Sequence, residues 1–308
     1  MSKDNFHKFD NNRRKFLTDS ARIVGSTIFL ATPLPNFAVG LHQHDEHITV
    51  GQIIDRFISE VKGAPFTGTV DTLKAGSRDI VVTGIVTAMF ATIEVIEKTI
   101  VLGANFIIAH EPTFYNHEDA TDWINNDEVY KYKAALLKDH NIAVWRNHDY
   151  IHSMDPDGVR KAVIDQLGWN KYGNADQPVF NFDRAITLKA LIENLKVKMS
   201  IHTLRYIGNL DQLCNKAVLL PGASGRFKQI NITSANRADV LICGEVSEWE
   251  TAEYVRDANA AGKKLALIVL GHIASEEAGS IFMQNWVKAH FHALKTTFIR
   301  TGNSLSFI

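Results

Sequence analysis

The stretch Leu267-Ile-Val-Leu-Gly-His272-Ile-Ala-Ser-Glu276 joins an aliphatic run to a histidine and a glutamate four positions apart. The aliphatic run is typical of a buried β-strand. A helix that begins directly after it would place His272 and Glu276 on one face, because four residues make about one helical turn. An imidazole and a carboxylate that converge at a strand end form half of a site for Zn, Mn or Fe. The alternative is an acidic helix cap beside a histidine that has no role.

The same pattern occurs earlier in the chain, in Phe106-Ile-Ile-Ala-His110-Glu111-Pro112. We expect a helix around Tyr130–Leu137 and a second strand from Asn141 to Trp145. That strand leads to His148 and, four residues later, to a further histidine. This module therefore offers four candidate site residues: His110, Glu111, His148 and His152.

The C-terminal half repeats this plan, with a strand at 238–243, a helix at about Glu250–Ala261 and a strand at Lys264–Leu270. Two strand-helix-strand modules predict an α/β protein with two similar lobes, whose mixed sheets are flanked by helices and whose metal site lies in the cleft between the lobes. We expect lobe one at about 48–180 and lobe two at about 181–308.

Lobe two also contains segments that favour structural roles. Thr187–Met199 has helical apolar spacing and is expected to dock on the second sheet. Gly222-Ala-Ser-Gly225 could cradle a phosphate but lacks the Walker ending, so a tight turn is favoured. Cys243 lies in an apolar run, which favours a buried free thiol, and a disulfide with Cys214 is the alternative.

The composition is that of a globular protein of enzyme size. The chain has 308 residues, 45% of them hydrophobic, and a formal net charge of -1. This balance gives no electrostatic reason to expect nucleic acid or an anionic membrane surface as a partner. The 13 histidines are more than such a chain usually carries. Three of them, His42, His44 and His47, lie in a polar stretch that we interpret as a linker.

Residues 1–45 are interpreted as a twin-arginine signal and linker. Asn12-Arg13-Arg14-Lys15-Phe16-Leu17 carries the paired arginines, and Ile23–Ala31 supplies a short apolar run. That run is shorter than the roughly 20 residues that cross a bilayer, so no stable membrane insertion is expected. Export to the periplasm is the expected outcome, with Ala38 as a candidate cleavage point. The alternative is a basic tail followed by a chance apolar patch.

From Ile48 onward the chain resembles the dinuclear-metal hexamer family related to the Nif-three protein, which is often labelled type 2 GTP cyclohydrolase I. The resemblance covers about residues 50 to 308 and depends on the order and spacing of five segments: Ile80–Thr92, Gly103–Tyr115, Pro221–Gly225, Ala238–Glu245 and Gly271–Glu276. It implies two divalent metal ions and a homo-hexamer with sites that face an internal cavity.

Two departures from the family pattern balance each other. The family usually has His-His-Pro where this chain has His110-Glu111-Pro112, and a carboxylate where this chain has His152. The total of three imidazoles and two carboxylates is therefore kept, which favours a rewired but working site over a decayed one. Asp149 is an alternative to His152. The ligands implied by the resemblance are His110, Glu111, His152, His272 and Glu276, with Glu276 and Glu111 as candidate bridges.

The predicted function is a metal-dependent hydrolase of a small molecule, with a cyclohydrolase-like or phosphate-containing substrate. His148 is the candidate general base, and the alternative is a group that orients a metal ligand. The alternative is a non-catalytic metal-binding or storage scaffold, because Trp249 stands where the family has a histidine near the cluster. An exported enzyme would meet little GTP, so a different substrate is expected.

Overall fold

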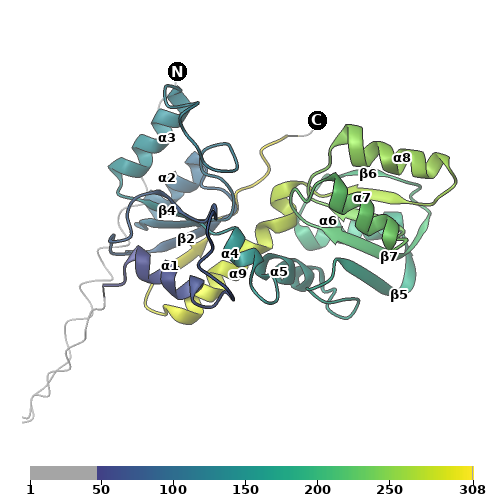
Figure 1. Ribbon diagram of the computed structural model, residues 1–308, viewed down its shortest axis with the longest axis horizontal. Helices are drawn as coiled ribbons and strands as arrows, with labels where there is room; N and C mark the ends of the chain where they lie inside the picture. The colour runs from purple at the N-terminus through teal and green to yellow at the C-terminus, as the bar shows by residue number, and fades with distance from the viewer. Residues whose placement is uncertain (1–46, 307) are drawn as a thin grey trace, which may run out of the picture. The chain divides into compact units, whose positions relative to one another are not determined.

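The computed structural model describes residues 47–306 and residue 308. The expected twin-arginine segment, its apolar run and Ala38 lie outside these residues. The described chain contains two five-stranded sheets, each flanked by helices (Figure 1). Both sheets mix parallel and antiparallel pairs, which confirms the predicted α/β fold class.

The first sheet has the strand order β1-β4-β3-β2-β10. Four of its strands run parallel and β1 is antiparallel to β4. Every residue of β2, β3 and β4 is buried, as expected for parallel strands that are covered on both faces. The bounds are β1 (Leu73–Ala75), β2 (Ile85–Ala88), β3 (Phe106–Ala109), β4 (Ala143–Arg146) and β10 (Thr296–Phe298).

Alternate side chains of these strands pack against different helices. Val86, Ile107 and Val144 belong to a cluster that includes buried residues of α2 and α3. On the other face, Trp145 contacts Phe57 of α1. The helices of this half are α1 (Val50–Ile58), α2 (Ile93–Val101), α3 (Glu128–Asp139), α4 (Asp149–His152) and α5 (Gly158–Leu167).

The second sheet has the order β5-β7-β8-β9-β6, with antiparallel strands at both edges. Its strands are β5 (Val179–Thr187), β6 (Arg205–Ile207), β7 (Leu213–Leu220), β8 (Val240–Cys243) and β9 (Ala266–Val269). Its helices are α6 (Leu188–Met199), α7 (Arg226–Ala235), the π-helix η1 (Glu248–Ala252) and α8 (Glu253–Ala260).

Helix α6 confirms the helix expected at Thr187–Met199. Thr187 caps it by accepting a hydrogen bond from the Ala190 N–H, and Leu195 is fully buried in the same core cluster as Ile242 of β8. Both cysteines are buried free thiols, so the alternative of a disulfide is wrong.

Helix α9 (His272–His290) begins two residues after β9 and leads the chain back to the first sheet, where β10 pairs in parallel with β2. Strand β10 thus joins the first sheet, although its residues lie in the range expected for lobe two. At 19 residues, α9 is about 28 Å long, which lets it link the two sheets. Within the described residues, neither α9 nor any other helix has the length and apolar character that would let it span a membrane.

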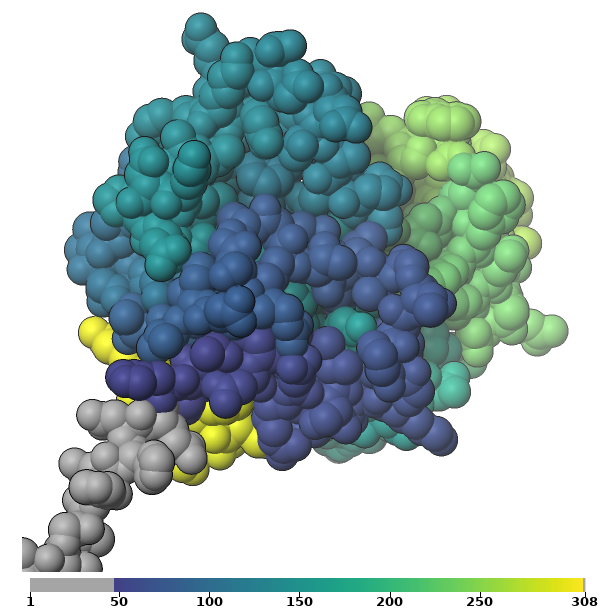
Figure 2. Space-filling view, turned by 60° about the vertical axis from the view of Figure 1, so that its left-hand side comes forward, coloured from purple at the N-terminus to yellow at the C-terminus, as the bar shows by residue number. Residues whose placement is uncertain are grey.

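Side chains of α9 complete the core of the first half. The ring of Trp286 lies 4.8 Å from that of Phe57, and its Nε1 donates a hydrogen bond to Glu60. Figure 2 shows this packing at the surface, where yellow residues near the C-terminus appear beside the purple residues of α1. The last part of the chain therefore packs against the first described helix.

The contribution of α6 to the core can be measured by one pair of substitutions. Leu195→Ala removes a fully buried side chain and should lower the free energy of unfolding by about 2 to 5 kcal/mol in a urea titration. Val197→Ala on the same helix changes a side chain that is 76% exposed and should stay within about 0.5 kcal/mol of the unmodified protein. Equal effects would show that α6 is not docked through its predicted apolar face.

Candidate metal centre

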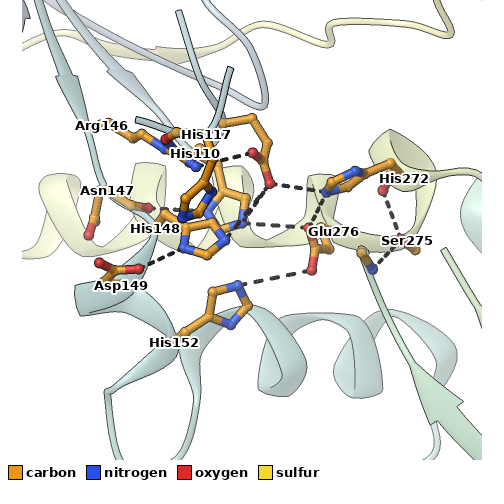
Figure 3. A network of polar contacts seen from close by, with 12 residues as sticks. His110, His117, Arg146, Asn147, His148, Asp149, His152, His272, Ser275 and Glu276 are labelled. Carbon is orange, nitrogen blue, oxygen red and sulfur yellow. Dashed lines mark hydrogen bonds and ion pairs between the residues drawn. The ribbon is translucent and has the colours of Figure 1, made fainter. Parts of the chain in front are cut away.

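The site residues lie at the ends of parallel strands and at the start of α9 (Figure 3). His110 and Glu111 directly follow β3, and His148 directly precedes α4. Because the carboxyl ends of parallel strands meet at one edge of a sheet, β3 and β4 deliver these side chains to one place. His272 and Glu276 share a face of α9, as predicted from their spacing.

The carboxylate of Glu276 lies at the middle of this cluster. Its Oε2 atom is 3.0 Å from Nε2 of His272 and 3.6 Å from Nε2 of His110. Its other oxygen, Oε1, lies 4.0 Å from Nε2 of His152. The two oxygens of one carboxylate thus face different imidazoles.

Glu111 presents a single oxygen to the same space. Its Oε1 lies 3.0 Å from Nε2 of His272, 3.9 Å from Nε2 of His148 and 4.0 Å from Nε2 of His110. Its Oε2 lies 3.4 Å from the guanidinium of Arg146, which is fully buried at the end of β4. Arg146 therefore leaves Oε1 as the oxygen that faces the histidines.

All four imidazoles are oriented in the same way. Each ring places Nδ1 near an oxygen that can only accept a hydrogen bond, so Nδ1 carries a proton. In His110, His148 and His152 this leaves the lone pair on Nε2, whereas Nε2 of His272 lies 3.0 Å from oxygens of Glu111 and Glu276 and donates to them when no metal is bound. The four pairs are His110 with the Asn147 carbonyl at 3.1 Å, His148 with Asp149 at 3.0 Å, His152 with Asp157 at 3.0 Å, and His272 with Glu245 at 2.7 Å. The Nε2 lone pairs of His110, His148 and His152 therefore face the carboxylates of Glu111 and Glu276, which can accept hydrogen bonds but cannot donate them.

This donor set fits divalent metal ions. Two triads bring one donor atom per residue within 4.8 Å of one another: His110, His148 and His152, and His110, Glu111 and Glu276. Donors bound to one ion at about 2.0–2.2 Å lie roughly 3 to 3.5 Å apart, close to the spacing found here. In addition, Nε2 of the buried His110 has no hydrogen-bond partner among the described residues. Imidazoles that donate Nδ1–H to carboxylates or carbonyls are the usual arrangement around a bound metal.

The electrostatics of the cluster also call for a cation. Burial acts to raise the pKa of Glu276, but the neighbouring imidazoles of His110 and His272 outweigh it and hold that pKa well below its ordinary value. Burial acts to lower the pKa of His272, but its contacts with Glu111, Glu245 and Glu276 raise it to about 12. The buried carboxylates are therefore ionised, and positive charge must lie beside them.

His148 behaves differently. Burial, together with the neighbouring His110, lowers its pKa to about 4, so its ring is neutral near pH 7. A neutral ring with a free Nε2 can accept a proton or bind a metal ion. The geometry thus accommodates both the predicted general base and a metal ligand.

Asp71 and Asp149 support His148. Asp71, to which the sequence assigned no role, is buried and accepts hydrogen bonds from the backbone N–H groups of His148 and Tyr150. Asp149 directs one oxygen to His148 and the other to Thr69. Both oxygens of Asp149 thus accept hydrogen bonds, and Asp149 stays an alternative to His152 as a ligand.

The Gly-rich segment makes room for Glu276. A Cβ atom on Gly222 would lie 2.3 Å from Oε1 of Glu276, and the φ angle of Gly222 is +61°. The Gly222 N–H donates to Oγ of Ser275, which in turn donates to the His272 carbonyl. This segment is therefore a turn packed on the cluster, as the favoured interpretation expected, and its closeness to Glu276 is an added finding.

Two residues that orient imidazoles were missed by sequence reasoning. Asp157 and Glu245 were not singled out as partners of His152 and His272. Only the strand-Gly-acid pattern before Glu245 gave a local signal. Trp249, where the family resemblance implied a missing histidine, is 80% exposed.

The chain is similar in sequence to known proteins. The family model for Duf34/NIF3 (NGG1p interacting factor 3) matches residues 71–304. A Clostridium acetobutylicum protein named GTP cyclohydrolase 1 type 2 homolog is 26% identical over 233 residues, which cover 72% of this chain and 82% of that protein.

Two solved structures share the fold. A Staphylococcus aureus hypothetical protein has a TM-score of 0.67 at 18% identity, over 85% of this chain and 99% of its own. A Bacillus cereus protein related to NIF3 has a TM-score of 0.65 at 17% identity, over 84% of this chain and 98% of its own.

The close approach of Gly222 to Glu276 yields a paired test. Gly222→Ala should displace the Glu276 carboxylate and weaken zinc binding by roughly tenfold or more, the range seen when groups that orient ligands are lost. Gly225→Ala also places an alanine at a positive φ angle, +76°, but its Cβ would meet nothing within 4 Å. Zinc titration monitored by a chelating dye should separate the two variants, and equal affinities would contradict the cradle described here.

Proposed function

The chain belongs to the Duf34/NIF3 family, and from this membership and the donor cluster we propose that it binds two divalent metal ions and hydrolyses a small molecule. One observation carries the metal proposal: four imidazole Nε2 atoms converge on two buried, ionised carboxylates. Zn, Mn and Fe all suit a mixed nitrogen and carboxylate donor set.

The donors divide into two groups around Glu276. Its Oε2 lies on the side of His110 and His272, and its Oε1 lies on the side of His152. Glu276 would therefore help to hold both ions, together with Glu111, His110 and His272 on one side and His152 on the other. Bound ions of this kind supply Lewis acidity, which makes water a nucleophile near neutral pH.

The accessible side of the cluster supports hydrolysis. His110, Glu111 and Glu276 are each less than 10% exposed, whereas the side chains of His148 and His152 are 26% and 28% exposed. A substrate would reach the cluster from that side. There the neutral His148, oriented by Asp149, would accept a proton from the attacking water.

The substrate class is a cyclic amide or a phosphate-containing small molecule. The name of the Clostridium acetobutylicum relative, GTP cyclohydrolase 1 type 2 homolog, supports a cyclohydrolase-like reaction. The alternative is a non-catalytic metal-binding or storage scaffold, which the deep burial of three donors favours. Homo-hexamer formation and export through the twin-arginine pathway belong to the same proposal.

Metal stoichiometry tests the first half of this proposal. The unmodified protein, reconstituted with zinc and desalted, should hold about two ions per chain by inductively coupled plasma mass spectrometry. Glu276→Gln should lose at least one ion, because the amide removes the bridging charge. Glu277→Gln changes the next residue of α9, which contacts Thr301 and Arg300 instead, and should keep both ions. Full occupancy in Glu276→Gln would contradict the assignment.

Turnover tests the second half. The zinc-loaded protein should hydrolyse at least one member of a panel of cyclic amides and phosphate esters, and chelation should abolish that activity. His148→Ala should keep two zinc ions and lose about 100-fold or more in turnover if His148 is the general base. Loss of an ion would make His148 a ligand instead. No turnover across the panel by the fully loaded protein would favour the scaffold.

A further inference from the structure

A groove of about 760 Å³ adjoins the metal centre. One end reaches Glu245, whose carboxylate holds Nδ1 of His272 at 2.7 Å. The groove also includes His117, whose ring lies 6.2 Å from that of His148. Its apolar wall comes from the start of α2 and from the segment after β3: Phe90, Ile93, Pro112 and Tyr115.

A buried lysine lies in this groove. Lys133 of α3 is 4% exposed, and its Nζ donates a hydrogen bond to the Thr113 carbonyl at 2.6 Å. The ammonium also lies 5.2 Å from the ring centre of Tyr115 and 5.7 Å from that of Phe114. Within residues 47–306 it forms no ion pair with a carboxylate. Since an ammonium group has three donors, two N–H groups remain for a ligand.

A buried lysine without an ion-pair partner destabilises the folded protein when no ligand is bound. Burial lowers its pKa to about 8, although the charge of Asp119 acts in the opposite direction. A buried cation is usually paired, because desolvation of a lone charge costs several kcal/mol. The two N–H groups of Lys133 that have no partner among the described residues therefore indicate a binding site for the anion of a ligand.

The conformation of Tyr115 is a second, independent sign of a binding site. Its φ angle is +69°, a strained backbone conformation that is rare for a bulky residue. Its side chain is nonetheless 54% exposed at the groove and covers the Lys133 ammonium. Strain of this kind persists mainly where a site requires it.

We propose that this groove is the substrate pocket of the metal centre, in which Lys133 anchors a carboxylate or phosphate oxygen while Phe90 and Tyr115 hold a planar ring. The half-exposed carboxylate of Glu245 at the other end repels an anion, so it orients the charged group toward Lys133. The role of this groove as a substrate pocket rests on the proposed hydrolase function. The anion site itself depends on groove residues and not on bound metal.

Phenyl phosphate and benzoate serve as probes, with benzyl alcohol as the neutral analogue. Isothermal titration would compare the unmodified protein with Lys133→Met, which keeps the chain length and removes the charge. Phenyl phosphate and benzoate should each bind Lys133→Met at least tenfold more weakly, while benzyl alcohol binds both proteins equally. Lys131→Met is the matched control, because Lys131 is exposed on the same helix and donates to the Asn126 carbonyl.

A second variant covers the case in which Lys133→Met fails to fold. Tyr115→Gly removes an exposed ring and accepts the positive φ angle, so it should fold and bind phenyl phosphate and benzyl alcohol both more weakly. Unchanged affinity of Tyr115→Gly for both probes, or of folded Lys133→Met for both anions, would overturn the proposal.

Each titration would be run on zinc-loaded and on chelator-treated protein. The proposal expects the effect of Lys133→Met in both forms. Phenyl phosphate binding that requires zinc and ignores Lys133 would overturn the groove while leaving the metal centre intact. Binding of the probes that depends on Lys133, in a protein that takes up no zinc on reconstitution, would instead refute the metal-dependent hydrolase and leave the anion site intact.

Discussion

Two ionised carboxylates buried against imidazole lone pairs are the constraint on which this site depends. Glu111 and Glu276 are each less than 10% exposed, and the desolvation of such charges costs several kcal/mol per ion unless a cation lies beside them. Hydrogen bonds to Nδ1 fix each ring with Nε2 facing inward, and His110, His148 and His152 offer lone pairs there. Only positive charge between these donors, supplied by bound metal or by protonation of His272, relieves the repulsion.

The fold serves this constraint through one helix. The parallel strands of the first sheet end beside each other and deliver one set of donors. Helix α9 delivers the other set in its first turns, and its later residues Met283 and Trp286 pack in the core of the first half. Because the donors of α9 and the packing of α9 are parts of one rigid element, metal binding and the docking of the C-terminal segment should stabilise each other. The glycine at position 222 then lets the neighbouring loop approach Glu276.

Local patterns in the sequence predicted the central strands β3, β4, β8 and β9, helix α6 and the ligand candidates, because a buried parallel strand and a histidine-acid pair one turn apart are properties of adjacent residues. The partners of the imidazoles were harder to find. Asp157 and Glu245 contact their histidines only in the tertiary fold. Arg146 is fully buried, although a charged residue at the end of a strand gives no sign of burial in the sequence. The return of β10 to the first sheet was missed for the same reason, since strand pairing depends on where α9 ends and not on the strand itself.

The most direct test of the central claim is an anomalous difference map, collected at the zinc absorption edge from crystals of the zinc-reconstituted protein. We expect two peaks roughly 3.5 to 4 Å apart, separated by the Glu276 carboxylate. One peak should lie about 2.0 to 2.1 Å from Nε2 of His110 and His272, and the other at that distance from Nε2 of His152. A map with no peak between Glu111 and Glu276, or with zinc bound through Nδ1 of these histidines, would contradict it.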